Sequence, residues 1–498
     1  MKKIVIVGGG IAGLTAGIYA QKYGFESVIY EKHTIVGGQC TGWDRNGYHI
    51  DNCIHWLTGS KKESGMYESW VETGALGPDV ELIRIPYFGV YEIDGVTITL
   101  WKDADKLRQE LKDISPADAV LIDELVDDII AGGSVEMPIK APMDMLSMKD
   151  LMELGSKSKA AMSIMKKYQH VSCVDYGKKY QHPALQKLFT VSMPEGYSIT
   201  AFIMSMATVC SGDGDIPKGG SRAMAFRMAD RYQKHGGKIV TGTGVEEILT
   251  DKVKGKETAT GVRLESGDII KADYVIAAGD AYYTLHKLLK GRFTDKRLDN
   301  RFADMKTYKL PTSAHVIFAV DAEAKDIPKS ILFETEPYTV AIRKFDYMSF
   351  INYAYEPDFH PEGKSLFSVY LDQSDEDFLW WEQLYKDREK YQGEKSRIAL
   401  FCQEKIEERY PELKGKLTLI DTYTPMTYHR FTGTYHGAWM SFLMTPQSKS
   451  LQHKGIIKGL KNCYMAGMYM MSPGGLPVAL ATGKFAVQRI CKQERIQL

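Results

Sequence analysis

Short apolar runs alternate with helical spacing at the start of the chain. Lys3–Val7 is a β-branched run, which is typical of a fully buried parallel strand. Apolar residues such as Leu14 and Ala20 follow, and they predict a helix that ends near Tyr23. Ser27–Tyr30 predicts a second buried strand. The chain therefore opens with a predicted strand, helix and strand, the beginning of an α/β fold.

The segment between the first strand and the helix reads GGGIAG, a GxGxxG motif that runs from Gly8 to Gly13. Gly8 permits a tight turn, Gly10 lets the backbone approach a pyrophosphate, and Gly13 allows the helix to pack closely on the strand. The free N–H groups and the dipole of the helix N-terminus favour negative charge there. Glu31 ends the second strand, where a carboxylate accepts the hydroxyls of an adenosine ribose. A dinucleotide site is predicted, although Glu31 alone does not separate FAD from NAD.

Two later stretches continue the same pattern. A helix predicted from roughly 222 to 235 precedes Lys238–Val240, and three more strands are predicted at Val262–Leu264, Asp268–Ile270 and Ala272–Ala278. Near the C-terminus, a predicted strand ends at Gly467, and a glycine-rich loop then opens a helix. These segments would complete a discontinuous dinucleotide domain. The alternative for the last segment is an ordinary C-terminal helix that docks on the fold.

A double glycine and an aspartate separate FAD from NAD. Gly37 and Gly38 follow Glu31, and Gly47 and Asp51 come next. This pattern, E-x5-GG and then G-x3-D, resembles the FAD-binding members of the superfamily that contains amine oxidases and phytoene desaturases. Together the motifs resemble the phytoene desaturase, carotenoid isomerase and retinol saturase group most closely, over residues 1 to about 60, 213 to 281 and 461 to 490.

The resemblance implies an FAD cofactor and a two-part fold. A discontinuous Rossmann-type FAD-binding domain is expected over 1–85, 210–285 and 455–498, with an α+β substrate-binding domain over 86–209 and 286–454. In the resembling family the residue at Val245 lies beside the adenine, and an acidic residue often occupies the position of Met468. The FAD-binding residues expected from the motifs and the resemblance are Gly8, Gly10, Ile11, Ala12, Gly13, Glu31, Lys32, Gly37, Gly38, Val245, Gly279, Gly467, Met468, Gly475, Leu476 and Pro477.

Composition and missing motifs narrow the chemistry. The 63 basic and 63 acidic side chains balance, so nucleic acid is not expected as a partner. The sequence has no second GxGxxG and no metal-ligand spacing, so no metal is expected. None of the seven cysteines forms a CxxC pair, which favours reduced thiols in a cytoplasm and disfavours a disulfide reductase. Electrons must then pass to or from the substrate, a quinone, oxygen or another protein.

The substrate half contains methionine-rich helical spacing but no catalytic signature. Between Met143 and Tyr168, apolar residues recur at helical intervals, with lysines at 157, 159, 166 and 167. Such a face suits a long apolar ligand, or contact with an anionic membrane surface. The alternative is that the methionines fill a core. With no apolar run long enough to span a membrane, a cytoplasmic location with peripheral membrane contact is expected.

His55 is the catalytic candidate, because it follows the double-glycine motif where the chain is expected to pass the flavin ring. It could move a proton during hydride transfer, or serve as a structural hydrogen-bonding residue. Tyr435 and His436 are weaker candidates.

The resemblance implies desaturation, saturation or isomerisation of carbon–carbon double bonds in an apolar polyene, isoprenoid or fatty-acyl substrate, with hydride passing to or from flavin N5. One alternative is a flavin amine oxidase, with Tyr464 and Trp439 as candidates for an aromatic cage. Another is a flavin-bearing binding protein without turnover. The direction of reaction, the electron partner and the oligomeric state are left open.

Overall fold

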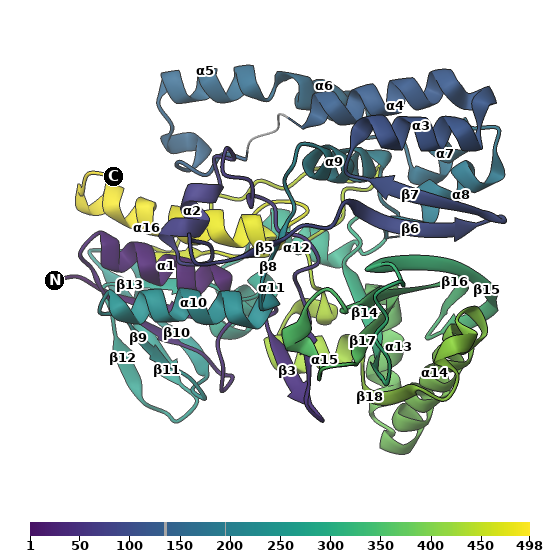
Figure 1. The fold of residues 1–498 in the computed structure, drawn as a ribbon. Helices are drawn as coiled ribbons and strands as arrows, with labels where there is room; N and C mark the ends of the chain where they lie inside the picture. The colour runs from purple at the N-terminus through teal and green to yellow at the C-terminus, as the bar shows by residue number, and fades with distance from the viewer. Residues whose placement is uncertain (134–136, 195) are drawn as a thin grey trace.

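A computed structural model describes residues 1–133, 137–194 and 196–498 (Figure 1). One part of the fold is organised around a five-stranded parallel sheet, which brings together segments that lie far apart in the sequence. The strand order is β19-β13-β1-β2-β9. The strands span Lys3–Val7 (β1), Glu26–Tyr30 (β2), Lys238–Val240 (β9), Tyr274–Ala277 (β13) and Cys463–Met465 (β19).

The central strand β1 is buried on both faces, as its continuous apolar run predicts. Ile4 and Ile6 pack against the helices on one face, while Val5 faces the opposite side. Three helices cover the first face: α1 (Ile11–Lys22), α10 (Gly220–Lys234) and α16 (Gly475–Glu494). An antiparallel sheet of β10 (Val245–Val253), β11 (Lys256–Leu264) and β12 (Ile269–Lys271) packs on the second. The predicted α/β fold with a Rossmann-type FAD-binding domain is confirmed.

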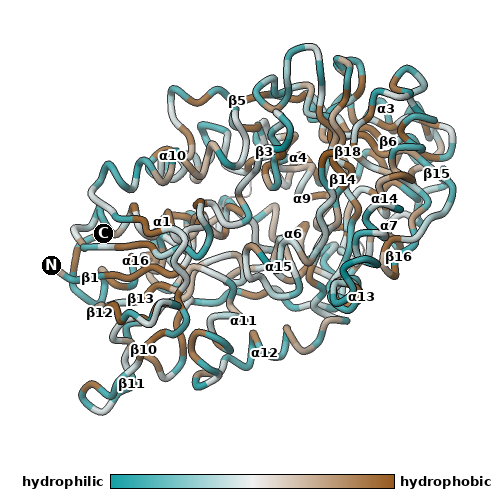
Figure 2. The backbone as a smooth tube through the Cα atoms, turned by 90° about the horizontal axis from the view of Figure 1, so that it is seen from below, coloured by the Kyte–Doolittle hydropathy of each residue, from teal (hydrophilic) through white to brown (hydrophobic). Residues whose placement is uncertain are grey.

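A second, seven-stranded sheet has the order β18-β14-β17-β16-β15-β6-β7. Its β15 pairs parallel with β6, and its other pairs are antiparallel. Its strands span Tyr87–Ile93 (β6), Val96–Trp101 (β7), Pro311–Val320 (β14), Ser330–Val340 (β15), Arg343–Asn352 (β16), Ser365–Ser374 (β17) and Leu417–Tyr423 (β18). Hydrophobic segments follow the strands of both sheets (Figure 2). Helices α13 (Asp375–Tyr385) and α14 (Arg388–Arg409) pack on its apolar face.

A helical layer lies beyond β6 and β7 (Figure 1). It contains α3 (Ala104–Ile114), α4 (Ala119–Gly132), α5 (Met148–Lys157), α6 (Lys159–Tyr168), α7 (Cys173–Gly177), α8 (Pro183–Val191) and α9 (Ile199–Cys210). Shorter elements are α2 (Tyr67–Glu72), α11 (Ala281–Tyr283), α12 (Lys296–Ala303), α15 (Pro425–Thr432), the hairpin β3 (Gly42–Arg45) with β4 (Tyr48–Asp51), and the pair β5 (Leu82–Ile83) with β8 (Ile216–Pro217). The predicted boundary between a flavin part and a substrate part stays a prediction; of its ranges, 134–136 and 195 lie outside the described residues.

The methionine-rich segment forms α5 and α6 along one edge of the molecule (Figure 1). Met148, Met152 and Met162 are 70%, 71% and 62% exposed. The alternative that these methionines fill a core is therefore wrong. Their helical spacing is amphipathic, but the apolar side chains of these three residues point outward.

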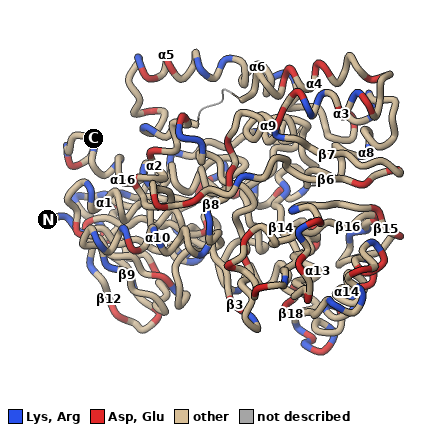
Figure 3. Tube along the Cα trace, in the orientation of Figure 1, with Lys and Arg blue, Asp and Glu red and all other residues tan. Residues whose placement is uncertain are grey.

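Basic and acidic residues are interspersed along the chain (Figure 3). In the part of the chain that the structure describes, no helix combines the length and the apolar character needed to cross a membrane.

Candidate active site

A cavity of about 1150 Å³ opens where the carboxyl ends of the parallel strands meet the second sheet. The ends of β1, β2 and β13 bring Gly8, Glu31 and Gly279 to one edge, because parallel strands end on the same side of a sheet. Residues of α9, β15 and α16 complete the cavity wall. The glycine motifs and the apolar substrate half therefore line one continuous cavity.

The turn after β1 has the geometry that its glycines predict. Gly8 has a φ of +102°, which favours glycine. A Cβ built on Gly13 would lie 1.9 Å from the Gly8 carbonyl oxygen, so only glycine lets α1 approach this closely. At Gly10 the nearest atoms to such a Cβ are 3.8 Å away, which leaves its cavity side open to a ligand. The helix N-terminus therefore faces the cavity across an unobstructed backbone.

Glu31 is buried at the end of β2, with 8% of its surface exposed. Its Oε2 accepts a hydrogen bond from Gly9 N at 2.6 Å, and its Oε1 accepts one from His33 N at 2.8 Å. These bonds hold the carboxylate rigidly, and each oxygen keeps a lone pair for a further donor. The Thr243 N–H donates to the Glu31 carbonyl, which brings the segment before Val245 beside this strand end.

The double glycine lies directly against the first motif. Gly37 N donates to the Gly9 carbonyl at 2.9 Å, and Gly37 forms a bridge with Gly10. Asp51 then ties this segment to α10, because it accepts from both the N and the Oγ of Ser221 at 2.6 Å. The buried Asp51 carboxylate thus joins the last residue of the E-x5-GG…D pattern to the start of α10.

The C-terminal segment closes the site from another side. Gly475 begins α16, and a Cβ built on Gly483 would lie 2.3 Å from the Ala12 carbonyl, so α16 packs tightly on α1. Gly467 N donates to Thr482 Oγ1 at 2.9 Å. The segment is therefore part of the site, and the alternative of an ordinary docking helix does not describe it.

Most of the predicted cofactor residues line this one cavity. Those that do are Gly8, Gly10, Ile11, Ala12, Glu31, Gly37, Gly38, Gly279, Gly467, Met468, Gly475, Leu476 and Pro477. Gly13, Lys32 and Val245 are not among the lining residues. Gly13 acts through helix packing, and the Val245 side chain is buried under the antiparallel sheet. Lys32 is exposed beside Gly433.

His55 lines the cavity, as the motif position predicts. Burial, reinforced by the charge of nearby Lys329, lowers the pKa of His55 to about 3. The imidazole is therefore neutral at physiological pH. Its Nδ1 is buried without a protein partner in the described part of the chain. The side chain can accept or relay a proton, but it does not reach the site as an imidazolium.

The other sequence candidates lie in different places. Trp439 lines the cavity. Tyr464 does not, because it lies on β19 and its hydroxyl donates to Gln493, so the geometry gives it no place in an amine cage. Neither Tyr435 nor His436 lines the cavity, and their rings stack on each other. Burial lowers the pKa of His436 to about 4.

The sequence patterns did not indicate several of the residues that line the cavity. Asp280 follows Gly279 and accepts from the Tyr283 and Tyr435 N–H groups, and burial raises its pKa to about 6. Its position directly after a predicted strand was a signal that could have found it. It adds a carboxyl to the same cavity in which Met468 replaces the acidic residue of the resembling family.

A buried histidine also faces the cavity from β14. His315 stacks on Tyr423 with ring centroids 4.5 Å apart, and Ser313 Oγ lies 3.0 Å from its Nε2. Burial and the nearby His55 lower the pKa of His315 to about 3. Because β14 is buried along its whole length and bears no motif, only the folded sheet identifies His315 as a site residue.

All seven cysteines are free. The β3–β4 register pairs Gly42 with Asp51, and continuing it by two residues places Cys40 opposite Cys53. Both line the cavity. The sequence alone did not predict that Cys40 and Cys53 lie opposite each other, because this depends on the register of the hairpin.

The donor set fits FAD. The backbone of the two glycine motifs suits a pyrophosphate, and the Glu31 carboxylate suits the hydroxyls of a ribose. Further along the cavity, polar groups such as Thr41 Oγ1, Tyr423 OH and Trp439 Nε1 are buried without protein partners in the described residues. Buried polar atoms without partners are costly, so these groups suit the polar edge of a bound cofactor.

Several known proteins are similar to this chain in sequence or in fold. The chain is 24% identical over 310 residues to the phytoene desaturase (neurosporene-forming) of Cereibacter sphaeroides, a match that covers 60% of this chain and only 58% of that protein. It is 22% identical to the 4,4'-diapophytoene desaturase (4,4'-diapolycopene-forming) of Methylomonas sp., over 100% of this chain and 96% of that one. A redesigned putrescine oxidase shares the fold, with a TM-score of 0.59, 14% identity and 99% coverage of both chains.

A model of the family described as flavin containing amine oxidoreductase matches residues 11–491, nearly the whole chain. The resemblance inferred from the motifs is confirmed by the desaturase relatives. The family match covers both halves of the cavity. It agrees with the two glycine motifs and the buried Glu31, which indicate a flavin dinucleotide site. The protein is an FAD-dependent oxidoreductase, and the chain belongs to the flavin containing amine oxidoreductase family.

Proposed function

We propose that the protein desaturates, saturates or isomerises carbon–carbon double bonds of an apolar polyene, isoprenoid or fatty-acyl chain. The observation that carries this proposal is the continuity of the cavity from the glycine motifs into an apolar wall. Its volume of about 1150 Å³ exceeds the usual range of small-ligand pockets, roughly 300–1,000 Å³. A cofactor and a long chain therefore have room in one enclosed space.

The wall beyond the glycine motifs is mainly hydrophobic and comes from both the helical layer and the second sheet. Its apolar members include Trp56, Phe88, Val90, Met204, Ile331, Leu332, Phe350 and Met444. A wall of this kind binds methylene and vinyl groups by apolar burial, without fixing a particular hydrogen-bonding pattern. This favours a substrate that is apolar along most of its length.

FAD, when bound, supplies a hydride acceptor or donor. The protein supplies enclosure and a neutral histidine. Because His55 is uncharged and its Nδ1 has no protein partner in the described chain, it is suited to relay a proton near the reacting carbons. The apolar wall excludes water, which would otherwise compete for that proton.

Amine oxidation is the second candidate, because Trp439, Tyr423 and Tyr428 give the cavity an aromatic section. The cavity also contains Lys102 and Lys329. A protonated amine would be repelled by these cations, so we rank amine oxidation below chemistry on carbon–carbon bonds. A flavin-bearing binding protein without turnover is the third candidate.

Product mass separates the three carbon chemistries. FAD-loaded protein, oxidised or chemically reduced, is incubated without oxygen with a carotenoid, retinol and linoleate, and in parallel with benzylamine, and the products are analysed by mass spectrometry. Loss or gain of two hydrogen atoms identifies desaturation or saturation, and an isomer of unchanged mass identifies isomerisation. Conversion of amines alone, or of no compound, would contradict the proposal.

Peripheral membrane contact through α5 and α6 is also proposed, with a cytoplasmic location. The exposed Met148, Met152 and Met162 lie beside exposed Lys149 and Lys159. Apolar side chains insert at the headgroup boundary, and lysines are attracted to anionic lipid by about 1 kcal/mol each. A membrane would also give the protein access to an apolar substrate.

We predict that the protein floats with vesicles of phosphatidylcholine and phosphatidylglycerol in a density gradient. Replacing Met148, Met152 and Met162 together by serine should weaken this binding at least about tenfold, because three apolar side chains no longer insert. Because these side chains are exposed, folding should be unaffected. Equal flotation of both proteins, or none by either, would refute the membrane contact.

A further inference from the structure

Two lysines reach the cavity from the second sheet, at the ends of the two strands that flank β6. Lys102 follows β7 and Lys329 precedes β15, and both strands pair with β6. Lys329 N donates to the Tyr87 hydroxyl, and Lys102 N donates to the Pro86 carbonyl. Both side chains line the cavity. The sheet therefore brings two cations to a wall that is mainly apolar.

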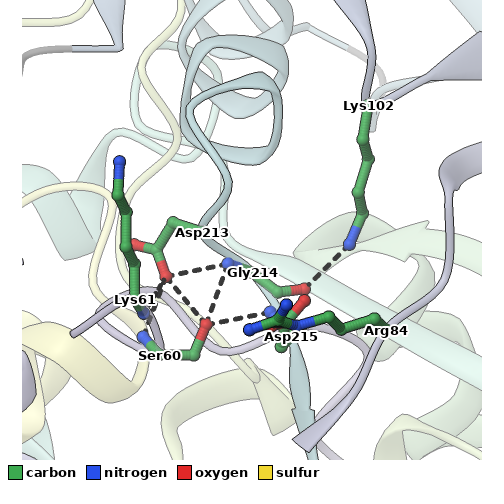
Figure 4. Close-up of polar contacts among 7 residues, drawn as sticks. All are labelled: Ser60, Lys61, Arg84, Lys102, Asp213, Gly214 and Asp215. Carbon is green, nitrogen blue, oxygen red and sulfur yellow. Dashed lines mark hydrogen bonds and ion pairs between the residues drawn. The ribbon is translucent and has the colours of Figure 1, made fainter. Parts of the chain in front are cut away.

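In the described part of the chain, each ammonium group donates to one backbone carbonyl. Lys329 Nζ donates to the His55 carbonyl at 2.8 Å. Lys102 Nζ donates to the Gly214 carbonyl at 3.1 Å (Figure 4). An ammonium group has three donors, so each keeps hydrogen-bonding capacity for a ligand. Neither lysine forms an ion pair with a carboxylate of the described residues.

The acidic groups whose charge acts on Lys102 are already engaged. Asp215 accepts from Arg84 Nε at 3.0 Å, and Asp213 accepts from Ser60 Oγ and the backbone N–H of Lys61 (Figure 4). These bonds tie the loop after Leu57 to the loop before β8. The two aspartates have structural roles, and Lys329 in particular is left without a counter-ion.

An enclosed cation without a counter-ion is costly, since the loss of hydration amounts to several kcal/mol per ion. Burial, with repulsion from Lys102, accordingly lowers the pKa of Lys329 to about 7. An apolar side chain would avoid this cost at a position that only lines a hydrophobic cavity. The pair of lysines is explained if the ligand itself brings a negative charge.

We propose that the substrate is an apolar chain that ends in a carboxylate, and that Lys329, supported by Lys102, binds this carboxylate. The inference rests on the proposed function, because it specifies the substrate class of the same cavity. Trp56, Phe88 and Ile331 line the cavity beside the lysines and would contact the adjoining methylene groups. A single negative charge suits the site, because Lys102 already lies in the field of Asp215 and Asp213.

Binding should depend on pH in a definite direction. Lys329 is faced by Lys102 and His55 and by the aromatic side chain of Tyr355, 5.8 Å from its Nζ, while its own backbone contacts Tyr87. The carboxylate is ionised above about pH 5. Affinity should therefore be highest below pH 7 and fall as Lys329 loses its proton, by up to about tenfold per pH unit.

The test measures equilibrium binding of linoleate, methyl linoleate, linoleyl alcohol and farnesyl phosphate to the FAD-loaded protein, by the change in flavin absorbance. Wild type should prefer linoleate over the ester at least about tenfold, the effect of one charge-assisted hydrogen bond. Lys329→Met should remove the preference while keeping ester binding, which also shows that the cavity is intact. Lys329→Arg should restore part of it. Lys325→Met, an exposed lysine on the same loop, should behave as wild type.

Equal binding of the acid and the ester by wild type would overturn the inference, as would an undiminished acid preference in Lys329→Met. Tight binding of farnesyl phosphate with none of linoleate would also overturn it, because the site would then recognise a phosphate. If linoleate binds through Lys329 but no unsaturated compound is converted, the proposed function fails and the carboxylate site stands. Conversion of neutral polyenes with no effect of Lys329 would leave the function and remove the inference.

Discussion

Replacing Gly13 with alanine is expected to produce a protein that purifies with little or no flavin. The added Cβ would lie 1.9 Å from the Gly8 carbonyl oxygen, a distance that no side chain can occupy. Helix α1 must then move away from the turn, and its N-terminal N–H groups leave the position from which they face the cavity. Overpacking of this kind costs roughly 1–3 kcal/mol, so FAD affinity should fall at least about tenfold.

The measurement is flavin content by absorbance after reconstitution with FAD. A matched control is Gly393→Ala in α14, where a built Cβ meets no atom within 4 Å. That substitution should leave flavin content unchanged and stabilise the helix by roughly 0.5–1 kcal/mol. Full flavin occupancy in the Gly13→Ala protein would show that the cofactor does not use this turn.

Replacing His55 with glutamine is expected to lower the turnover number at least about hundredfold while the protein retains its flavin. The size of the effect is typical of losing a positioned proton carrier. Because burial keeps the pKa of His55 near 3, this group should contribute no inflection to the pH profile of turnover between about pH 5 and 8. The Lys329 contact should persist in the variant, since it uses the His55 backbone carbonyl.

His170→Gln provides the control, because His170 is exposed and its ring bonds to the Pro446 carbonyl, away from the cavity lining. It should turn over substrate at the wild-type rate. If the His55→Gln protein does so as well, His55 is a structural residue and the proton must be handled elsewhere in the cavity.

The nucleotide part was the most predictable from sequence, because each of its signals is local. A buried strand, a glycine turn and a carboxylate at the next strand end are read within 31 residues, and β1, β2 and Glu31 lie where these signals indicate. The order of the sheet could not be read in this way. Strands β13 and β19 join on the far side of β1 through contacts between distant segments.

The substrate side of the cavity was less predictable for the same reason. Lys102 and Lys329 have no motif around them, and they meet only because β7 and β15 both pair with β6. His315 lies in a strand whose ten residues are all buried, so its position carries no periodic signal. The methionines of α5 and α6 illustrate a different limit of sequence patterns. Their helical spacing predicts an apolar face, but it does not reveal whether another part of the protein covers that face.

The central claim is that this cavity performs hydrogen transfer on an unsaturated apolar chain. The most direct measurement follows the long-wavelength absorption band of the FAD-loaded, oxidised protein without oxygen, after addition of linoleate or a carotenoid, and of benzylamine and putrescine in parallel. The account predicts bleaching of the flavin by an unsaturated apolar compound, or conversion of that compound after prior reduction of the flavin, and no response to either amine. Bleaching by the amines alone would contradict the account and identify the protein as an amine oxidase.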